Sequence, residues 1–430
     1  MTPSRRGLLQ GVGLASVAYA APAVTAPDPD AASLQAMLEH YASFGDKASG
    51  GAGDEASAAW LEGELTRAGY VCRRQTFQAP YFDVRQASLT CGAATAQVIP
   101  QAIVAPTGPQ GLTAPLRLAR GGGELTGAIA LAVLPYKRWV ALAEAPASAA
   151  LTDALGRGAA GVVLVTTGPT GEAIALNVST RHPAIDKPVA VLAPKDAAPF
   201  LAAAAARGQN ATLALDGAGG GGARRPAANL IARLDRGAAK TLVISTPRSG
   251  WFGCAAERGS GLAVWLTLAQ WLARARHPVN VELLATSGHE YGFLGGERYL
   301  AEAAPPPAAT ALWIHIGASA AARDWHELGR LLPLPSADSQ RVMTATADRL
   351  EATRRAFQGV TGLEATYLAD KAMAGGELSN VLAAGYASAI GLYGIHRYFH
   401  TRADDLRCVS GDLVAPVAAA YRAAITAFLA

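Results

Sequence analysis

Between residues 229 and 430, short apolar runs alternate with longer amphipathic segments, and this alternation constrains the fold more than any other feature of the sequence. The runs expected as strands are 229–234, 241–245, 281–285, 311–316 and 387–392, and the expected helices are 261–274, 338–358 and 413–429. Strands separated by helices usually run parallel and are buried on both faces. We therefore predict an α/β fold with a mixed, mostly parallel sheet and helices on both faces.

The most polar connection of this region follows the run 281–285. Residues 288–296 read Gly-His-Glu-Tyr-Gly-Phe-Leu-Gly-Gly, so His289 and Glu290 come just after an expected strand, among glycines that permit unusual backbone conformations. In open α/β sheets, ligands and catalytic groups gather at the carboxyl ends of the strands. His289 and Glu290 are therefore candidate site residues, although an isolated His-Glu pair also suits a merely solvated connection.

Composition excludes several classes of partner and scaffold. The chain has 430 residues, of which 51% are hydrophobic and 16% charged, enough for a large core and two or three domains. Its net charge of +4 is small and its basic residues are scattered, so we expect no nucleic-acid or anionic-membrane partner. The four cysteines form no Cys-x-x-Cys pair, which disfavours a thiolate zinc site and a disulfide-built scaffold. Cys72 and Cys91 could pair across a hairpin or remain free thiols.

The N-terminus resembles a twin-arginine export signal. Ser4-Arg5-Arg6-Gly7-Leu8-Leu9-Gln10 precedes a short, alanine-rich apolar run, and we assign residues 1–26 to the signal. An uncleaved anchor is the alternative, but the apolar run is short for a membrane-spanning helix. We expect a periplasmic or secreted protein that is exported folded and has no integral membrane segment once the signal is removed.

The chain between the signal and residue 229 divides into three parts that differ in their expected secondary structure. Residues 31–115 are expected as two helices followed by strands 70–77 and 84–90 and an extended, proline-broken stretch. Residues 116–216 change to short strands and small helices, and the runs 158–165 and 187–191 resemble the protease-associated domain, a β-rich lid. Residues 217–222 are nearly all glycine and are expected as a hinge. We predict one domain from 31–115 and 223–430, with an insert at 116–216.

Four motifs occur in an order that resembles the co-catalytic zinc aminopeptidases, the group of bacterial leucyl aminopeptidases and glutamate carboxypeptidases. The motifs are residues 242–245 before a loop, Glu-Arg-Gly-Ser-Gly at 257–261, Gly-His-Glu-Tyr-Gly-Phe-Leu-Gly at 288–295, and Tyr-Phe-His-Thr-Arg-Ala-Asp at 398–404. The resemblance implies two zinc ions held by two His, two Asp and a Glu, with a neighbouring Glu as the base for a bridging water.

The match at the metal-ligand positions is incomplete. Pro247 and Ser249 stand where the family has a His and an Asp, and another Asp is missing near Gly317. Glu257 replaces the bridging Asp, while His289-Glu290 replaces the family's Glu-Glu pair. His400 matches the last zinc ligand. These losses leave too few donors for two ions, and we expect at most one.

The resulting site prediction is specific. Glu290 and His400 are the expected metal ligands, with His315 or Glu257 assisting, and His289 or Glu257 is the expected general base. Glu377, Arg258 and Tyr291 are expected to face the substrate. His315 could instead be a core histidine, and Glu377 could simply cap a helix. Histidine and carboxylate ligands suit zinc, and also manganese or iron.

Three functions are compatible with these residues. The first is an exported, metal-dependent aminopeptidase-like hydrolase that cleaves an amide bond of a peptide or related small substrate at a remodelled site. The second is a pseudoenzyme that has lost its metals and binds a ligand or protein partner in the old cleft. In the third, Ser249 is a nucleophile served by His289, but no recognisable nucleophile elbow surrounds it. The sequence leans towards the hydrolase and leaves the oligomeric state open.

Overall fold

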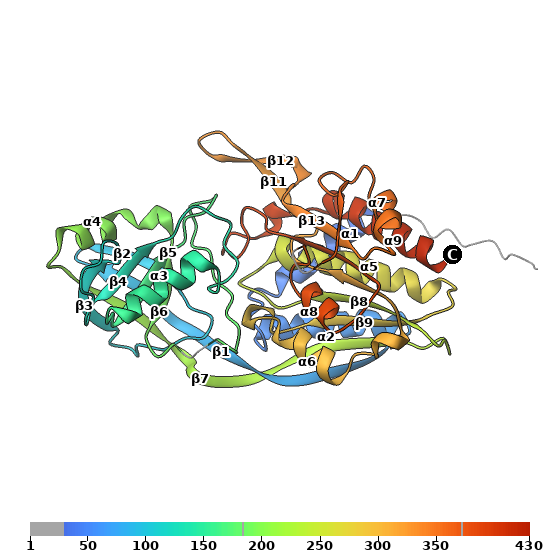
Figure 1. Ribbon diagram of the computed structural model, residues 1–430, viewed down its shortest axis with the longest axis horizontal. Coiled ribbons are helices and arrows are strands. Elements are labelled where there is room, and N and C mark those ends of the chain that lie inside the picture. The colour runs from blue at the N-terminus through green and yellow to red at the C-terminus, as the bar shows by residue number, and fades with distance from the viewer. Residues whose placement is uncertain (1–29, 183–184, 371–372) are drawn as a thin grey trace, which may run out of the picture.

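The computed structural model describes residues 30–182, 185–370 and 373–430, and the export signal expected at 1–26 lies outside them. Two sheet-containing parts lie side by side and are joined by a long two-stranded ribbon (Figure 1). The part with both the first and the last helix carries most of the helices, and the other part is the predicted insert.

The larger part is built on a mixed sheet. Its strands run in the order β7-β9-β8-β10-β15-β13-β14. The central strands are β9 (Asn280–Thr286), β8 (Thr241–Pro247), β10 (Thr310–Ile316) and β15 (Ala389–Gly394), and each is parallel to its neighbour. All seven residues of β8 and of β9 are buried, as expected for strands covered on both faces. The predicted α/β class is confirmed.

Helices cover both faces of this sheet. The helices α1 (Ala31–Ser43), α2 (Ala52–Arg67), α5 (Ser260–Arg274) and α9 (Gly411–Leu429) contribute to one apolar core. The opposite core is smaller and includes residues of α6 (Leu294–Glu302) and α8 (Leu378–Ala383). The expected apolar face of α5, with Leu262, Trp265, Leu266, Ala269 and Leu272, is buried in the first core.

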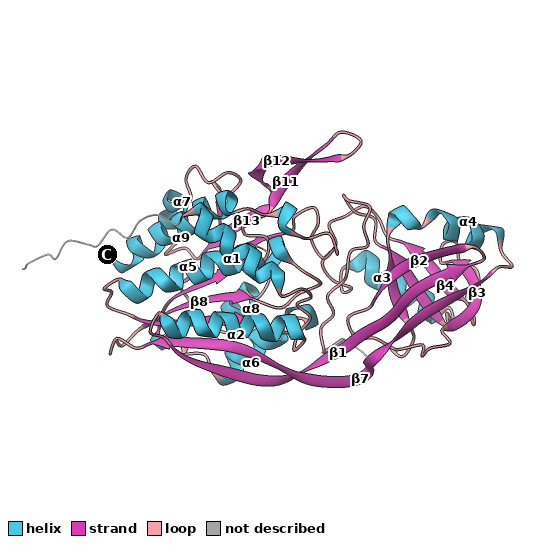
Figure 2. Cartoon of the chain, turned by 180° about the vertical axis from the view of Figure 1, so that it is seen from behind, coloured by secondary structure: helices cyan, strands magenta, loops and turns pink. Residues whose placement is uncertain are grey.

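The ribbon that joins the two parts consists of β1 (Val71–Cys91) and β7 (Asn210–Leu234), paired antiparallel along most of their lengths (Figure 2). The two strands predicted at 70–77 and 84–90 are one continuous strand, and the residues predicted as a glycine hinge, 217–222, continue β7. Pro80 lacks a backbone N–H, and it lies beside a register shift between Pro80 and Phe82. A proline is tolerated in a strand at such an irregularity.

The strands of the insert continue the sheet of the larger part through β7, and together the two parts form one 13-stranded sheet. The strands are β2 (Ala94–Pro100), β6 (Val189–Leu192), β5 (Gly161–Val165), β4 (Ile129–Val133) and β3 (Leu112–Leu118), in that spatial order. One face packs against α3 (Ala145–Gly156) and the other against α4 (Ala198–Ala206). Leu89 and Val98 belong to the second of these cores. The β-rich unit therefore starts within β1, earlier than the predicted boundary at residue 116.

A second correction concerns the helix expected at 338–358. That stretch instead forms strand β13 (Arg341–Ala345) and a short helix, α7 (Leu350–Ala356). β13 pairs antiparallel with β15 and parallel with β14 (Thr366–Leu368), so its backbone hydrogen bonds are satisfied within the sheet. A two-stranded hairpin of β11 (Arg323–Glu327) and β12 (Leu331–Ala337) projects beside it and was not foreseen.

Two expectations about the chain as a whole can be compared with the structure. Within the described residues, α9 is long and apolar enough to cross a membrane by length and composition, but one of its faces is buried against α1, α5 and α7, as in the core helix of a globular fold. All four cysteines are free. Cys72 and Cys91 lie at opposite ends of β1, so they cannot pair across a hairpin.

Candidate functional site

The predicted site residues come from the carboxyl ends of β9 and β10, from the segments that follow β8 and β15, and from the N-terminus of α8. His289 and Glu290 lie in a turn just after β9, between Gly288 and Gly292, whose positive φ angles of 81° and 72° favour glycine. Glu257 and Arg258 lie in one wide helical turn, Ala255–Gly259, between the loop after β8 and helix α5. Residues that are far apart in the sequence therefore meet at this edge of the sheet, where the sites of open α/β folds usually lie.

Glu257, Arg258 and His400 form a buried charged cluster. The Arg258 Nη2 atom lies 2.7 Å from Glu257 Oε1, and the His400 Nε2 atom lies 3.2 Å from the same oxygen. Arg258 Nε also donates to the Ser249 carbonyl at 2.9 Å. The three side chains are at most 1% exposed. The Arg258 guanidinium thus lies between Glu257, which replaces the family's bridging Asp, and the loop after β8, where Ser249 replaces another family ligand.

The insert fixes the orientation of His400. Its Nδ1 atom lies 2.9 Å from the Ala175 carbonyl, which can only accept, so Nδ1 carries a proton. The Ala175 N–H in turn donates to the His400 carbonyl at 2.9 Å, and the Val178 N–H donates to the Glu290 carbonyl at 3.0 Å. His400 Nε2 then faces the Oε1 atom of the Glu257 carboxylate at 3.2 Å, although neither atom makes a hydrogen bond within the part of the chain that the structure describes.

The electrostatics of the site favour an ionised Glu257, and they lower the pKa of two neighbouring imidazoles, those of His289 and His315. Burial opposes the ionisation of Glu257, but Arg258 and His400 outweigh it and lower the pKa of Glu257 to about 2. Burial, reinforced by the positive charge of Arg258, holds the pKa of His289 well below its usual range. Burial also lowers the pKa of His315 to about 4, against an opposing effect of Glu377.

His289 contacts a different carboxylate from His400. Its Nδ1 atom lies 3.2 Å from Glu377 Oε1, and the Thr286 hydroxyl donates to the same carboxylate at 2.9 Å. Burial raises the pKa of Glu377, opposed by His315 and Thr286. His315 is anchored through Nδ1, 3.0 Å from the Ser245 hydroxyl, and its buried Nε2 atom has no hydrogen-bond partner.

The Glu290 side chain points towards the loop between α1 and α2 and is held there by hydrogen bonds. The Ser49 N–H and the Ser49 hydroxyl each donate to Glu290 Oε1 at 2.7 Å, and the Ser249 hydroxyl donates to Oε2 at 2.9 Å. Burial raises the pKa of Glu290, and these hydrogen bonds oppose that shift. The Ser249 proton is thus used on a carboxylate while the His289 ring contacts Glu377, so the Ser249–His289 nucleophile reading is wrong.

The predicted metal ligands do not assemble into a ligand set. Across the described ranges, the one group of three His, Cys, Asp or Glu residues whose ligand atoms all lie within 4.8 Å of one another is His396, Asp404 and Cys408. Glu257, Glu290, His315 and His400 belong to no such group there. A catalytic zinc takes three protein ligands, so these four residues do not fit the expected ion, and Arg258 adds a competing positive charge.

A cavity of about 370 Å³ opens beside the cluster, at the seam between the insert and the larger part. Trp251, Phe252 and Tyr291 give it an aromatic wall, and Glu290 reaches it from the site. Its other polar lining residues are Asp46, Asp83, Gln101, Arg225 and Arg402. Tyr291 lines this cavity, whereas Arg258 and Glu377 do not, and its contact with a substrate stays a prediction.

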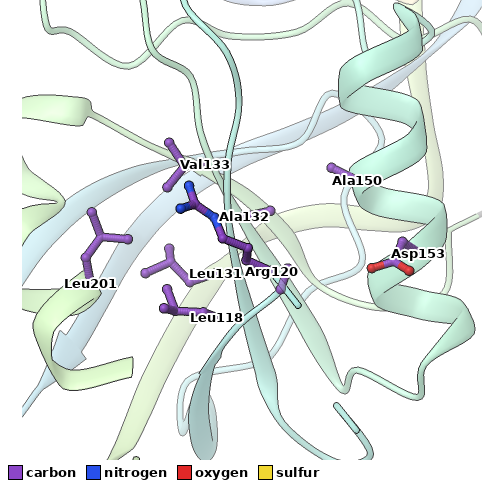
Figure 3. A pocket seen from close by; sticks show the side chains of 9 residues that line it. Leu118, Arg120, Leu131, Ala132, Val133, Ala150, Asp153 and Leu201 are labelled. Atoms are coloured by element: carbon purple, nitrogen blue, oxygen red, sulfur yellow. The ribbon is translucent and has the colours of Figure 1, made fainter. Parts of the chain in front are cut away.

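A second hollow, of about 510 Å³, lies wholly in the insert (Figure 3). Its lining is mostly aliphatic, with Arg120 and Asp153 as the charged side chains. None of the predicted site residues reaches it, so it is separate from the candidate site.

Several residues of the site carried no sequence motif. Ser49 comes from the glycine-rich loop between α1 and α2, and its role depends on a contact with a segment far along the chain. Arg248 and Asp54 form a fully buried ion pair at 2.8 Å beneath the loop after β8, and Asp54 also accepts from Ser287. One sign of this ion pair in the sequence is that Arg248 lies at the end of a strand, directly after Pro247.

No family model and no curated protein matches the sequence. Solved structures do match. A zinc aminopeptidase from Bacillus subtilis has a TM-score of 0.71 at 18% identity, covering 93% of this chain and 95% of that one. An aminopeptidase from Aneurinibacillus has a TM-score of 0.63 at 16% identity, covering 93% of both chains. A peptidase precursor from Shewanella amazonensis has a TM-score of 0.71 at 16% identity, covering 92% of this chain and 93% of that one.

These matches define the class of fold. The chain has the zinc-aminopeptidase-like fold over nearly its whole described length, insert included. At such identities the likeness concerns the fold, and the chemistry has to be argued from the residues of this chain.

Proposed function

We propose that this protein is a non-catalytic relative of the zinc aminopeptidases that binds a short peptide or related small amide in the seam cavity. The observation that carries the proposal is the Arg258 guanidinium, whose Nη2 atom forms a buried ion pair with Glu257 Oε1 at 2.7 Å and whose Nε donates to the Ser249 carbonyl. A permanent cation at this place supplies the charge that Glu257 needs, so no metal is required to keep that carboxylate ionised.

Electrostatics disfavour a divalent ion at the same place. Two unit charges 4 Å apart repel by about 4 kcal/mol at an effective dielectric constant of 20, and a doubly charged ion doubles that figure. An arginine remains protonated at any physiological pH. A metal could bind beside Glu257 only if several strong ligands offset this repulsion, and the neighbouring side chains offer too few.

The lining of the seam cavity supports a peptide ligand. Its volume of about 370 Å³ is within the range of small-molecule sites, which combine an apolar wall with a few polar groups. Trp251 and Phe252 offer the apolar wall, and Arg402 lies over the Phe252 ring at 4.3 Å. The Gln101 side chain is buried, and its Nε2 donor has no partner. A carboxylate terminus is a suitable partner for Arg402, which lines the cavity.

The metal-dependent hydrolase stays as the second candidate because of one contact. His400 is held through Nδ1 by a backbone carbonyl, as metal-ligating histidines commonly are, and its Nε2 atom faces Glu257. In that case Glu257 and His400 would hold the ion, His289 would be the nearby base, and the ion would activate a water. Arg258 would have to leave the Glu257 carboxylate first.

One experiment separates the two functions. The purified protein is incubated with zinc or manganese, its metal content and aminopeptidase activity are measured, and di- and tripeptides are titrated into it by calorimetry. We expect peptide binding without hydrolysis, and binding weakened at least tenfold in Trp251→Ala. The exposed Tyr136→Ala variant serves as the matched aromatic control.

Hydrolysis that is lost in both Glu257→Gln and His400→Ala would overturn the proposal in favour of the hydrolase. If those two variants still bind metal, the metal lies at another site. The Cys408→Ser variant described below tests whether that other site contains Cys408. Absence of binding for every peptide, with the parent folded, would also contradict it.

A further inference from the structure

We propose that His396, Asp404 and Cys408 form a zinc site that stabilises the loop between β15 and α9. The three residues are buried, and their ligand atoms all lie within 4.8 Å of one another. His396 Nε2 is 3.5 Å from Asp404 Oδ1, a separation expected for two ligands of one tetrahedral ion with bonds of about 2 Å. The site is distinct from the Arg258 cluster and shares none of its residues.

The imidazole is oriented as a ligand. Its Nδ1 atom is 2.8 Å from the Ser319 hydroxyl, which fixes the ring and can accept its N–H. Metal-bound histidines are usually held in this way through the nitrogen that does not bind the metal. The His396 Nε2 atom is buried and has no hydrogen-bond partner. An unpaired polar atom in the interior is unfavourable, and a metal bond would satisfy it.

The carboxylate is anchored in a suitable position. Asp404 accepts hydrogen bonds from the N–H groups of Ala256 at 2.8 Å and Glu257 at 3.0 Å, one on each oxygen. Each carboxylate oxygen has a second lone pair, so Oδ1 can bind an ion while it keeps the Ala256 contact. The same bonds connect the proposed site to the helical turn that carries Glu257 and Arg258.

The donor set selects the metal. One sulfur, one nitrogen and one oxygen ligand suit zinc, whereas calcium and magnesium prefer oxygen ligands alone. Three protein ligands leave a fourth position for water. On binding, the Cys408 thiol gives its proton to solvent and the thiolate sulfur donates an electron pair to the zinc, so the step involves no oxidation or reduction.

The spacing of the cysteines gave no sign of such a site, because a single thiolate with a His and an Asp needs no Cys-x-x-Cys pair. The three ligands come from the loop that also carries His400, and Cys408 lies just before α9 begins at Gly411. An ion here would fix both ends of that loop. We therefore expect the ion to stabilise this loop, with three protein ligands and a water rather than the four protein ligands of most structural zinc sites.

The test uses the full-length protein, stripped with a chelator and reloaded with zinc or cobalt alone. We expect one equivalent of zinc, an increased melting temperature on zinc addition, and thiolate-to-cobalt charge-transfer absorption in the cobalt form. Cys408→Ser and His396→Gln should lose the equivalent and the melting shift. Cys254→Ser, which changes another buried free cysteine, and His400→Ala should keep both.

X-ray absorption of the zinc-loaded parent covers the case in which Cys408→Ser fails to fold, and we expect a sulfur ligand in its spectrum. Zinc bound without a sulfur ligand, cobalt absorption retained in Cys408→Ser, or no zinc bound by the parent would each overturn the proposal. Zinc lost in His400→Ala but not in Cys408→Ser would instead support the metal-dependent hydrolase.

Discussion

At the scale of single residues, Arg258 places a buried positive charge beside Glu257. The strand-end positions of His289 and His315 could be predicted from the sequence, because each lies close to an apolar run. The direction of the Glu290 side chain could not, because its three donors come from Ser49 and Ser249 rather than from its own segment. An arginine beside a glutamate in a helical turn gave no sign that it would be buried as a counter-charge.

Replacing Arg258 by Met should destabilise the protein by about 3–5 kcal/mol, because Glu257 is then left as an unpaired buried charge. The free energy of unfolding in urea measures this loss. The double variant Glu257→Gln/Arg258→Met should recover much of it. Arg298→Met removes an ion pair whose side chains are about half exposed, 54% and 48%, and should change stability by less than about 1 kcal/mol. Equal effects of the two arginine variants would contradict the role given to Arg258.

His315 predicts a pH dependence of stability. Its pKa falls from the ordinary 6.5 to about 4 in the folded chain, chiefly through burial. Between these values the unfolded chain binds a proton that the folded chain does not, so stability decreases as pH falls from 6.5 to 4, by up to about 3 kcal/mol. The unfolding free energy of His315→Gln at pH 4.5 and 7 should differ less than that of the parent. His326→Gln, at an exposed histidine, should match the parent.

At the scale of elements, β1 and β7 depart most from the sequence prediction. The proline near the middle of β1 and the glycine run of β7 are ordinary signals of turns and hinges, yet each strand supplies the other with continuous backbone partners. Long-range pairing of this kind leaves no local trace. The same cause explains β13, which adopts a strand because β15 lies beside it.

Gly219→Ala tests whether the glycine run is held as a strand. Gly219 has φ 93°, and an added Cβ would lie 2.6 Å from the Tyr81 carbonyl oxygen, whereas Gly222 has φ 92° and no atom within 4 Å of that position. Both variants carry the same backbone strain, so the clash alone should make Gly219→Ala about 1–3 kcal/mol less stable than Gly222→Ala in urea unfolding. Equal stabilities, with rapid amide exchange across 217–222, would favour a flexible hinge.

At the scale of the whole molecule, the mixed sheet and its helical layers could be predicted because periodicity is a local property of the sequence. The extent of the insert could not, because its part of the sheet includes strand β2 and the distal half of β1, both before residue 116. Export also concerns the whole molecule, because the twin-arginine route transports proteins that have already folded. We keep the periplasmic or secreted location as a proposal based on residues 1–26.

Changing Arg5 and Arg6 together to Lys should retain the protein in the cytoplasm, because the export receptor recognises the arginine pair. Cell fractionation and immunoblotting measure the distribution. Gln10→Ala, which leaves the pair intact, is the control. Normal export of the double variant would contradict the assignment of the signal.

The reciprocal hydrogen bonds between Ala175 and His400, with the nearby Val178–Glu290 bond, make the insert part of the acid–base state of the site. If the insert swung away, the His400 ring would lose the carbonyl acceptor that its Nδ1 atom faces. A movement of the insert would therefore change both the access to the seam cavity and the hydrogen bonding of this imidazole. Nitrogen chemical shifts of His400 would report opening and closing without any label on the insert itself.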